Sequence, residues 1–350
     1  ITRTTYTVDN DIEKIQSAFG TSLQQDTRTF TYLQPGLVRT VKDANNNLTT
    51  YEYDGFNRLE RTLYPVPSLG ANASSTSDFE KWTYDPNGNV LTERRRDGTI
   101  VTNTYDNLNR LRTKSGSTIP TVTNSYDVMS RMTAASQTGS SVSWTYDALS
   151  RVKTETQPMG VVSYDYDAAS RRIRLTWPDA TSYITYEYNT LGEMTGIREP
   201  DFTLIHSIEY DDLGRTTGRG FNNFGAQGFT YDGISRLLAQ TTVPNVGGGA
   251  NNRAVTFGYN PASQLISHND NNANYSWTGS GTFTDAYVAD GLNRYATIGG
   301  QAMSYDSRGN MTDDGARTYA YDALNRLTSI GGGAAVEDDA TGSRVSVTGG

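Results

Sequence analysis

The chain has 350 residues, among them 23 tyrosines, 34 glycines and no cysteine, and its formal net charge is −8. This charge argues against nucleic acid as a partner, because no basic stripe is available to neutralise phosphates. The absence of cysteine excludes disulfides, thiolate metal sites and cysteine nucleophiles, and no apolar run approaches the roughly 18 residues of a membrane helix. Hydrophobic residues make up only 35%, which favours a sheet face lined with tyrosines over a compact core.

The N-terminal part, residues 1–52, consists of degenerate copies of a repeat that is clearer further along the chain. Residues 6–12 and 32–38 each keep a tyrosine, an Asn or Gly, and a final apolar residue. Residues 11–20 fit either a short helix or a strand, and the β repeats on both sides favour the strand. Residues 43–48 are expected to form a turn at the end of the sheet opposite to the repeat motif.

Residues 53–330 form the repeat array itself, and the first full motif begins at Tyr53. Its tyrosines recur about every 21 residues, which is the mark of a repeat architecture. After Tyr53, eight copies follow one another at this spacing. Their tyrosines are Tyr84, Tyr105, Tyr126, Tyr146, Tyr166, Tyr188, Tyr210 and Tyr231. We expect surface loops at residues 65–78, 244–252 and 268–274, where turn-forming and polar residues interrupt the spacing.

Two compact units close the array at Tyr305 and Tyr321, and residues 331–350 are expected to form a mobile, Gly-rich tail. At the other end, Ile1 opens in the middle of the pattern. We therefore expect the chain to be a piece of a longer polypeptide.

Each motif reads as a strand that ends in a tight turn. Bulky residues two positions apart, such as Trp82 and Tyr84, lie on one face of a strand, and the following Asp can accept backbone hydrogen bonds at the start of a turn. The fifth motif residue is always small or an Asn, which predicts a left-handed backbone at that position. These fifth residues are Asn57, Gly88, Asn109, Ser130, Ser150, Ser170, Gly192, Gly214, Ser235, Ser263, Asn293, Gly309 and Asn325.

A second turn signal, such as residues 96–99, separates successive motifs. Each repeat is therefore strand, turn, strand and opposite turn, and the sequence predicts an all-β antiparallel hairpin ribbon that twist coils into a shell or an open superhelical wall. We expect no helix longer than about two turns. The tyrosines at 84, 105, 126, 146 and 166 should form a largely buried row on one face.

Candidate chemistry is sparse. His206 and His268 lack the helical spacing of a zinc hydrolase, and the motif Asp recurs too regularly for a catalytic group. The acidic stretches at residues 269–272 and 313–315 do not have the spacing of a calcium loop. The recurring Arg, as in Arg110, should form carboxylate and cation–π ladders with the Tyr or Asp of the neighbouring unit. We assign no catalytic, cofactor-binding or metal residue.

The motif Tyr-Asp-x-x-(Gly/Asn/Ser)-Arg-Leu, repeated in register across residues 6–327, resembles the YD repeat of the RHS family. This family includes bacterial rearrangement-hotspot proteins, the cocoon subunits of insecticidal toxin complexes and the teneurin shells of animals. The resemblance implies a β ribbon that spirals into a hollow shell, which in many members encloses a C-terminal toxin domain. After Leu327 the chain lacks the Asp-Pro-x-Gly-x-x-Asp-Pro segment of self-cleaving members, so proteolysis and toxicity are not carried over.

Two functions follow as hypotheses. In the first, the chain is a non-catalytic section of the wall of a secreted or surface bacterial container, and its partner is the cargo domain of its own polypeptide. In the second, it is an extracellular structural or adhesive element that forms filaments or binds glycans or another cell. Neither requires nucleic acid, a membrane span or a cofactor.

Overall fold

The computed structural model describes residues 2–244, 248–275, 285–331 and 333–348. Its contacts divide the chain into unit 1, made of Ile1–Val142 and Phe283–Gly350, and unit 2, made of Ser143–Thr282. The longest sheet joins 24 strands. In it, strands that follow one another in the chain pair with each other and are antiparallel. The prediction of an all-β ribbon of hairpins is confirmed.

Unit 1 begins with twelve strands of the long sheet, with the thirteenth lying at the boundary between the units. They are β1 (Arg3–Tyr6), β2 (Ile12–Ser17), β3 (Gln25–Gln34), β4 (Leu37–Asp43), β5 (Leu48–Tyr53), β6 (Leu59–Pro65), β7 (Ser74–Tyr84), β8 (Val90–Arg94), β9 (Ile100–Tyr105), β10 (Leu111–Gly116), β11 (Ile119–Tyr126), β12 (Met132–Gln137) and β13 (Ser140–Tyr146).

Unit 2 continues the same sheet. Its strands are β14 (Val152–Gln157), β15 (Gly160–Tyr166), β16 (Arg172–Thr176), β17 (Tyr183–Tyr188), β18 (Met194–Arg198), β19 (Leu204–Tyr210), β20 (Thr216–Phe221), β21 (Gly225–Tyr231), β22 (Leu237–Val243), β23 (Arg253–Tyr259) and β24 (Leu265–Asp270). The helices of the described residues are three short 3₁₀ turns, η1 (Asn222–Phe224), η2 (Gly248–Asn251) and η3 (Ala273–Tyr275), which agrees with the expected absence of long helices. None of the helices in this described part is long and apolar enough to cross a membrane.

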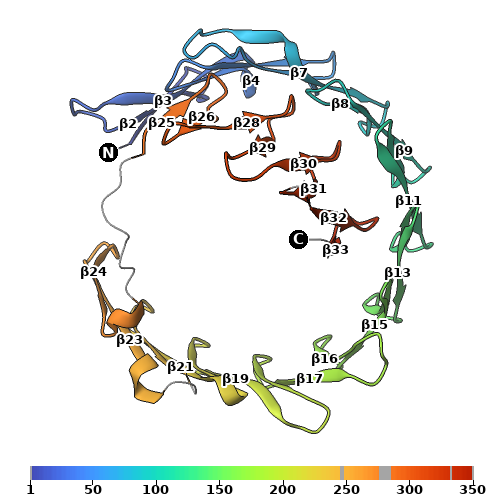
Figure 1. Cartoon of the computed structure of the whole chain (residues 1–350), viewed down its shortest axis with the longest axis vertical. Coiled ribbons are helices and arrows are strands. Elements are labelled where there is room, and N and C mark those ends of the chain that lie inside the picture. Colours follow the sequence, from blue (N-terminus) through green and yellow to red (C-terminus); the bar gives the residue numbers. More distant parts are fainter. Residues whose placement is uncertain (1, 245–247, 276–284, 332, 349–350) are drawn as a thin grey trace. The chain divides into compact units, whose positions relative to one another are not determined.

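The C-terminal part of unit 1 forms three small sheets, and Figure 1 shows their orange to red strands beside the blue to green strands of the same unit. The first sheet contains β25 (Tyr287–Ala289), β26 (Tyr295–Ile298) and β27 (Gln301–Ala302). The second contains β28 (Ser304–Tyr305) and β29 (Met311–Asp313), and the third contains β30 (Tyr319–Tyr321), β31 (Leu327–Ile330), β32 (Ala334–Asp338) and β33 (Arg344–Thr348).

Several local expectations can now be compared with the structure. The strand alternative for residues 11–20 is confirmed by β2. The loop expected at residues 65–78 is shorter, because β7 already begins at Ser74, and the loop expected at 268–274 is wrong in its first half, where β24 continues to Asp270. Of the loop expected at 244–252, residues 245–247 lie outside the described residues and η2 occupies most of the rest.

The predicted tail also contains regular structure. Strands β32 and β33 pair with each other, and the turn between them repeats the motif pattern, because the backbone N–H of Asp339 donates to the carbonyl of Ser343 and Gly342 has a φ of 86°. The predicted Gly-rich tail therefore contains a hairpin of the same kind as the repeats, and its mobility stays a prediction. Position 338 holds Asp where the motif has Tyr, which hid this repeat in the sequence.

A candidate functional site where two edges of the ribbon meet

The motif turn is a closed hydrogen-bonded unit, and residues 106–110 show its geometry. The backbone N–H of Asp106 donates to the carbonyl of Arg110, and that of Asn109 donates back to the carbonyl of Asp106. Oδ1 of Asp106 accepts from the backbone N–H groups of Leu108 and Arg110, while Oδ2 accepts from the Arg110 guanidinium at 2.7 Å. The hydrogen bond from Arg110 holds the pKa of Asp106 below its usual value, because it favours the charged carboxylate.

The prediction of a left-handed fifth residue is confirmed at all thirteen positions, with φ between 59° and 93°. Each motif hairpin is thus a turn followed by a left-handed residue, with a register shift before the second strand, as between Thr83 and Tyr84. Serine is an unexpected choice for a strained backbone. Part of the reason lies in the next contact, because Nη1 of Arg110 approaches Oγ of Ser130 in the following unit at 3.3 Å.

Successive units are joined by arginine and tyrosine. Arg110 lies 4.6 Å from the centre of the Tyr126 ring and donates to the carbonyl of Asp127, and the hydroxyl of Tyr126 donates back to the carbonyl of Leu111. The same stacking, at 4.5 to 4.8 Å, joins Arg58 to Tyr84, Arg151 to Tyr166, Arg171 to Tyr188, Arg215 to Tyr231, Arg236 to Tyr259 and Arg294 to Tyr305. The predicted cation–π ladder is confirmed, but the carboxylate partner is the Asp of the arginine's own unit.

The tyrosine row is confirmed in its placement but is less buried than predicted. Tyr84, Tyr105 and Tyr126 of unit 1, like Tyr166 of unit 2, each donate to the carbonyl of a residue that begins a strand of the preceding unit. All of them are half-buried. An arginine of the preceding unit stacks on the rings of Tyr84, Tyr126 and Tyr166, which accounts for part of their burial.

In unit 1, turns at the end of the strands opposite to the motif lie against motif turns from the C-terminal part of the unit. We call this contact the seam. It brings the turns between β4 and β5, β6 and β7, β8 and β9, β10 and β11, and β12 and β13 against the motif turns of the C-terminal strands. Its first step is made by Asn293, whose side chain bonds Asp43, Asn45 and Asn47. Burial alone would raise the pKa of Asp43, but the hydrogen bonds from Asn293 and Asn47 lower it.

This first step copies a contact between consecutive units of the array. There, Oδ1 of Asn109 accepts from the side-chain amides of Asn87 and Asn89, each at 3.0 Å. At the seam, Oδ1 of Asn293 accepts in the same way from Asn45 at 3.0 Å and Asn47 at 3.2 Å. Residues 43–47 therefore act toward the distant motif turn as a preceding repeat would.

The remaining steps follow in chain order on both sides. In the loop before β7, the carbonyl of Pro67 accepts from the backbone N–H of Gly291. Arg96 donates to the carbonyl of Arg308, whose own guanidinium lies 3.5 Å from Asp97.

Further along, the seam has an apolar step and a polar one. Val101, Ile119 and Ala323 form a buried cluster, and the partly buried Leu324 packs against it. The amide of Gln137 then donates to the carbonyl of Asp338 at 3.2 Å.

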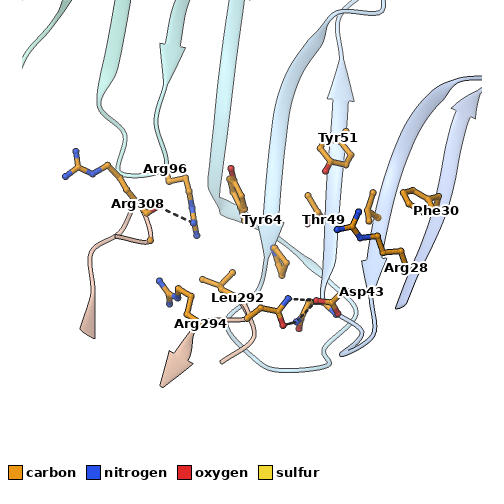
Figure 2. Close-up of a pocket in the computed structure, with 15 residues that line it drawn as sticks. Arg28, Phe30, Asp43, Thr49, Tyr51, Tyr64, Arg96, Leu292, Arg294 and Arg308 are labelled. Atoms are coloured by element: carbon orange, nitrogen blue, oxygen red, sulfur yellow. Dashed lines mark hydrogen bonds between the residues drawn. The ribbon is translucent and has the colours of Figure 1, made fainter. Parts of the chain in front are cut away.

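A cavity of about 660 Å³ opens beside the first steps of the seam, lined in part by four arginines (Figure 2). Arg96 is paired with Asp78, Arg294 with Asp290, and Arg308 with Asp306 and Asp97. Arg96 also lies 4.1 Å from the Tyr64 ring, and burial together with the hydrogen bond to Glu80 raises the pKa of Tyr64. Because three of the four guanidinium groups already have carboxylate partners, the cavity is a structural junction and a poor anion site.

The histidines and acidic stretches have local partners. His206 bonds the carbonyl of Gly220, and His268 packs on Phe257. Asp270 pairs with Arg253, and Asp314 accepts from the hydroxyl of Tyr319. Across the described ranges no three His, Cys, Asp or Glu side chains are grouped so as to hold a metal ion.

The seam was not found by reasoning from the sequence. Its signal is nevertheless present, because Asp43, Asn45 and Asn47 repeat the spacing of Asp85, Asn87 and Asn89 outside the expected motif position. The sequence did not indicate the partner of these residues, Asn293, which lies about 250 residues away in the chain.

The fold and the turn geometry define a class of protein, a β-hairpin repeat ribbon with Arg–Tyr ladders between its units. A family model described as the teneurin YD-shell matches residues 81–277, and the chain belongs to this family. No curated protein sequence is significantly similar to the chain.

Solved structures share the fold at low identity. The crystal structure of TcdB2-TccC3-TEV is 13% identical with a TM-score of 0.58, and the match covers 96% of this chain and 22% of that one. The Photorhabdus luminescens Tc holotoxin pore is 14% identical with a TM-score of 0.51, and the match covers 96% of this chain and 21% of that one. TcdB2-TccC3 without its hypervariable C-terminal region is 13% identical with a TM-score of 0.50, covering 99% and 19%. The chain thus spans about a fifth of the length of these structures.

Proposed function

We propose that the chain is a non-catalytic section of wall in a shell built by a secreted or surface protein, and that the shell encloses a cargo domain of its own polypeptide. The observation that carries this proposal is the seam of unit 1. Because the turns at the two ends of the strands bind each other, a second row of repeats can pack beside the first. A continuous wall needs such packing. Family membership in the YD-shell group supports the same function.

The recurring polar residues support a structural role. The motif carboxylates cap turns and pair with arginines of their own unit, and the arginines stack on tyrosines of the next unit. These groups are therefore engaged in holding the array together. Bacterial origin, extracellular location, and glycan or cell binding stay predictions.

The test uses the full polypeptide from which the chain comes. Sequencing the coding region beyond Gly350 should reveal a non-repeat domain, and limited proteolysis should leave that domain intact while the wall is folded. A variant that opens the seam, Ala323→Asp, should make the domain accessible, whereas the matched variant Ala148→Asp at the same motif position should leave it protected. Equal digestion of the domain in parent and both variants would contradict the container function.

A further inference from the structure

The ladder of arginines and tyrosines has two gaps in the regular part of the array. The sixth motif residue, which supplies the guanidinium in the other units, is Asn89 in one unit and Glu193 in another. The tyrosines that follow, Tyr105 and Tyr210, therefore receive no arginine from that position. A cavity of about 410 Å³ lies beside Tyr105 in unit 1, and one of about 360 Å³ lies beside Tyr210 in unit 2. Each missing arginine is thus accompanied by a cavity.

At the gap in unit 1, amide groups replace the guanidinium. Asn89 donates to Oδ2 of Asp85 at 2.8 Å, as the arginines of other units do to their own aspartates, and also to Oδ1 of Asn109 in the next unit at 3.0 Å. Asn87 donates to the same oxygen of Asn109. Two neutral donors therefore maintain the hydrogen bonds between these units.

The gap in unit 2 has the opposite polarity. The motif aspartate is here Asn189, whose Nδ2 donates to Oε2 of Glu193 at 2.7 Å. The turn keeps its side-chain bond, but its sixth residue now presents an acceptor to the next unit where an arginine would present donors. Oε1 of Glu193 lies beside Gly214, since a Cβ on that glycine would come within 2.8 Å of it. Among the described residues no donor bonds this oxygen.

The cavity in unit 2 combines an aromatic ring with carboxylates. Tyr210, Glu193, Glu209, Asp211 and Asp212 all line it. Asp211 is paired with the arginine of its own turn, whereas Glu209 and Asp212 are exposed and have no ion-pair partner among the described residues. These carboxylates are not grouped so as to hold a metal ion, so an organic cation is the class of ligand that fits.

The next unit shows which cation suits such a ring. Arg215 lies 4.8 Å from the centre of the Tyr231 ring and donates to the carbonyl of Asp232 and to Oγ of Ser235. Tyr210 is held as Tyr231 is, because each hydroxyl donates to a carbonyl of the preceding unit. A planar cation can stack on a ring placed in this way and still donate hydrogen bonds in its own plane.

We propose that the cavity of unit 2 binds a guanidinium group, supplied as an arginine side chain by a partner polypeptide. The guanidinium would stack on Tyr210 and donate to Glu193. Leu191 also lines the cavity and is 77% exposed, so it would cover the aliphatic stem of the arginine. A lysine ammonium fits less well, because it is not planar and cannot form a bidentate bond to a carboxylate. This inference does not depend on an enclosed cargo.

The experiment is an NMR titration of the chain with ring-labelled tyrosine, at low ionic strength because salt screens such contacts. The Tyr210 signals are assigned with Tyr210→Phe. The probes are a glycine peptide with blocked ends and one central arginine, the same peptide with lysine, and methylguanidinium. The arginine peptide should shift the Tyr210 ring signals and bind at least about 10-fold more tightly than either other probe, since lysine cannot stack in the same way and methylguanidinium lacks the stem.

Two variants and a control locate the site. Glu193→Gln removes the charged acceptor and should weaken binding about 10-fold, whereas Glu199→Gln removes the same charge from an exposed residue outside the cavity and should leave binding unchanged. The double variant Asn189→Asp with Glu193→Arg restores the motif of the other units. It should no longer bind the peptide, and its denaturant midpoint should rise because the ladder is then continuous.

Several outcomes would overturn the proposal. The Tyr210 signals could stay in place, the lysine peptide could bind as tightly as the arginine peptide, or Glu199→Gln could weaken binding as much as Glu193→Gln. The last two would show general attraction between opposite charges. Equal binding of methylguanidinium would point to a small molecule as the ligand and contradict a polypeptide partner. Undiminished binding by the double variant would place the site elsewhere.

Discussion

The motif turns around Ala323 and Ala148 have nearly the same sequence and very different surroundings. Both read Asp-Ala-Leu, then a small left-handed residue, then Arg, and both close with the same backbone and carboxylate bonds. Ala323 is 4% exposed because the seam covers it, whereas Ala148 is exposed. The comparison shows that the local sequence determines the shape of a turn, and that the distant edge it meets determines how much the turn contributes to stability.

The largest difference is expected from removing a whole repeat. Deleting residues 126–145 takes away Gln137, which makes the last contact of the seam. Deleting residues 188–209 of unit 2 removes a similar pair of strands with no known seam contact, so the ribbon should re-pair as a shorter array. Denaturant melts should show a clearly lower midpoint for the first deletion than for the second. Equal midpoints would mean that the seam adds little stability.

The next largest difference is expected from placing one charge at each of the two turns and comparing the free energies of unfolding. Ala323→Asp places a carboxylate in the apolar cluster with Val101 and Ile119, at a cost of about 3 kcal/mol, because no partner compensates the charge there. Ala148→Asp adds the same charge at the surface and should change the free energy of unfolding by less than about 0.5 kcal/mol. Urea titrations of both variants beside the parent make the measurement, and a small effect at Ala323 would contradict the packing described for the seam.

The polar step of the seam should have a smaller effect. Asn293→Ala removes the side chain that bonds Asp43, Asn45 and Asn47, and should cost about 2 kcal/mol because a partly buried carboxylate loses a donor. Asn57→Ala changes a residue of the same left-handed conformation and so reports the backbone cost alone. The difference between the two unfolding free energies measures the seam. No difference would show that Asn293 contributes only its backbone.

Acid should weaken the turns by small amounts at many sites. The folded pKa of motif carboxylates such as Asp106 and Asp211 lies below the unfolded value of 3.8, so their stabilisation is complete above that value and is lost as the pH falls through the folded pKa. The melting temperature should therefore stay level above about pH 5 and fall below about pH 4. Asp211→Asn should flatten this fall slightly, and an unchanged melting temperature between pH 5 and 2 would exclude the linkage.

The sequence predicted what depends on neighbours in the chain. Asn109 and Ser130 could be assigned a left-handed backbone because few residues tolerate it, and Arg110 could be placed near the next tyrosine because the units are stacked in order. It did not predict the partners of Asn293 or Ala323, because the seam joins residues through the path of the ribbon in space. The hairpin of Asp338 and Asp339 was missed for a simpler reason, the loss of its tyrosine.

The direction of the bonds between units has a consequence for biosynthesis. Arg110 is made before Tyr126, and it is the earlier residue that provides the flat guanidinium on which the later ring lies. The hydroxyl of Tyr126 likewise binds a carbonyl, that of Leu111, which has already left the ribosome. Each completed repeat is therefore a ready template for the one that follows, and the ribbon can lengthen in step with its own synthesis, without waiting for the C-terminal segment.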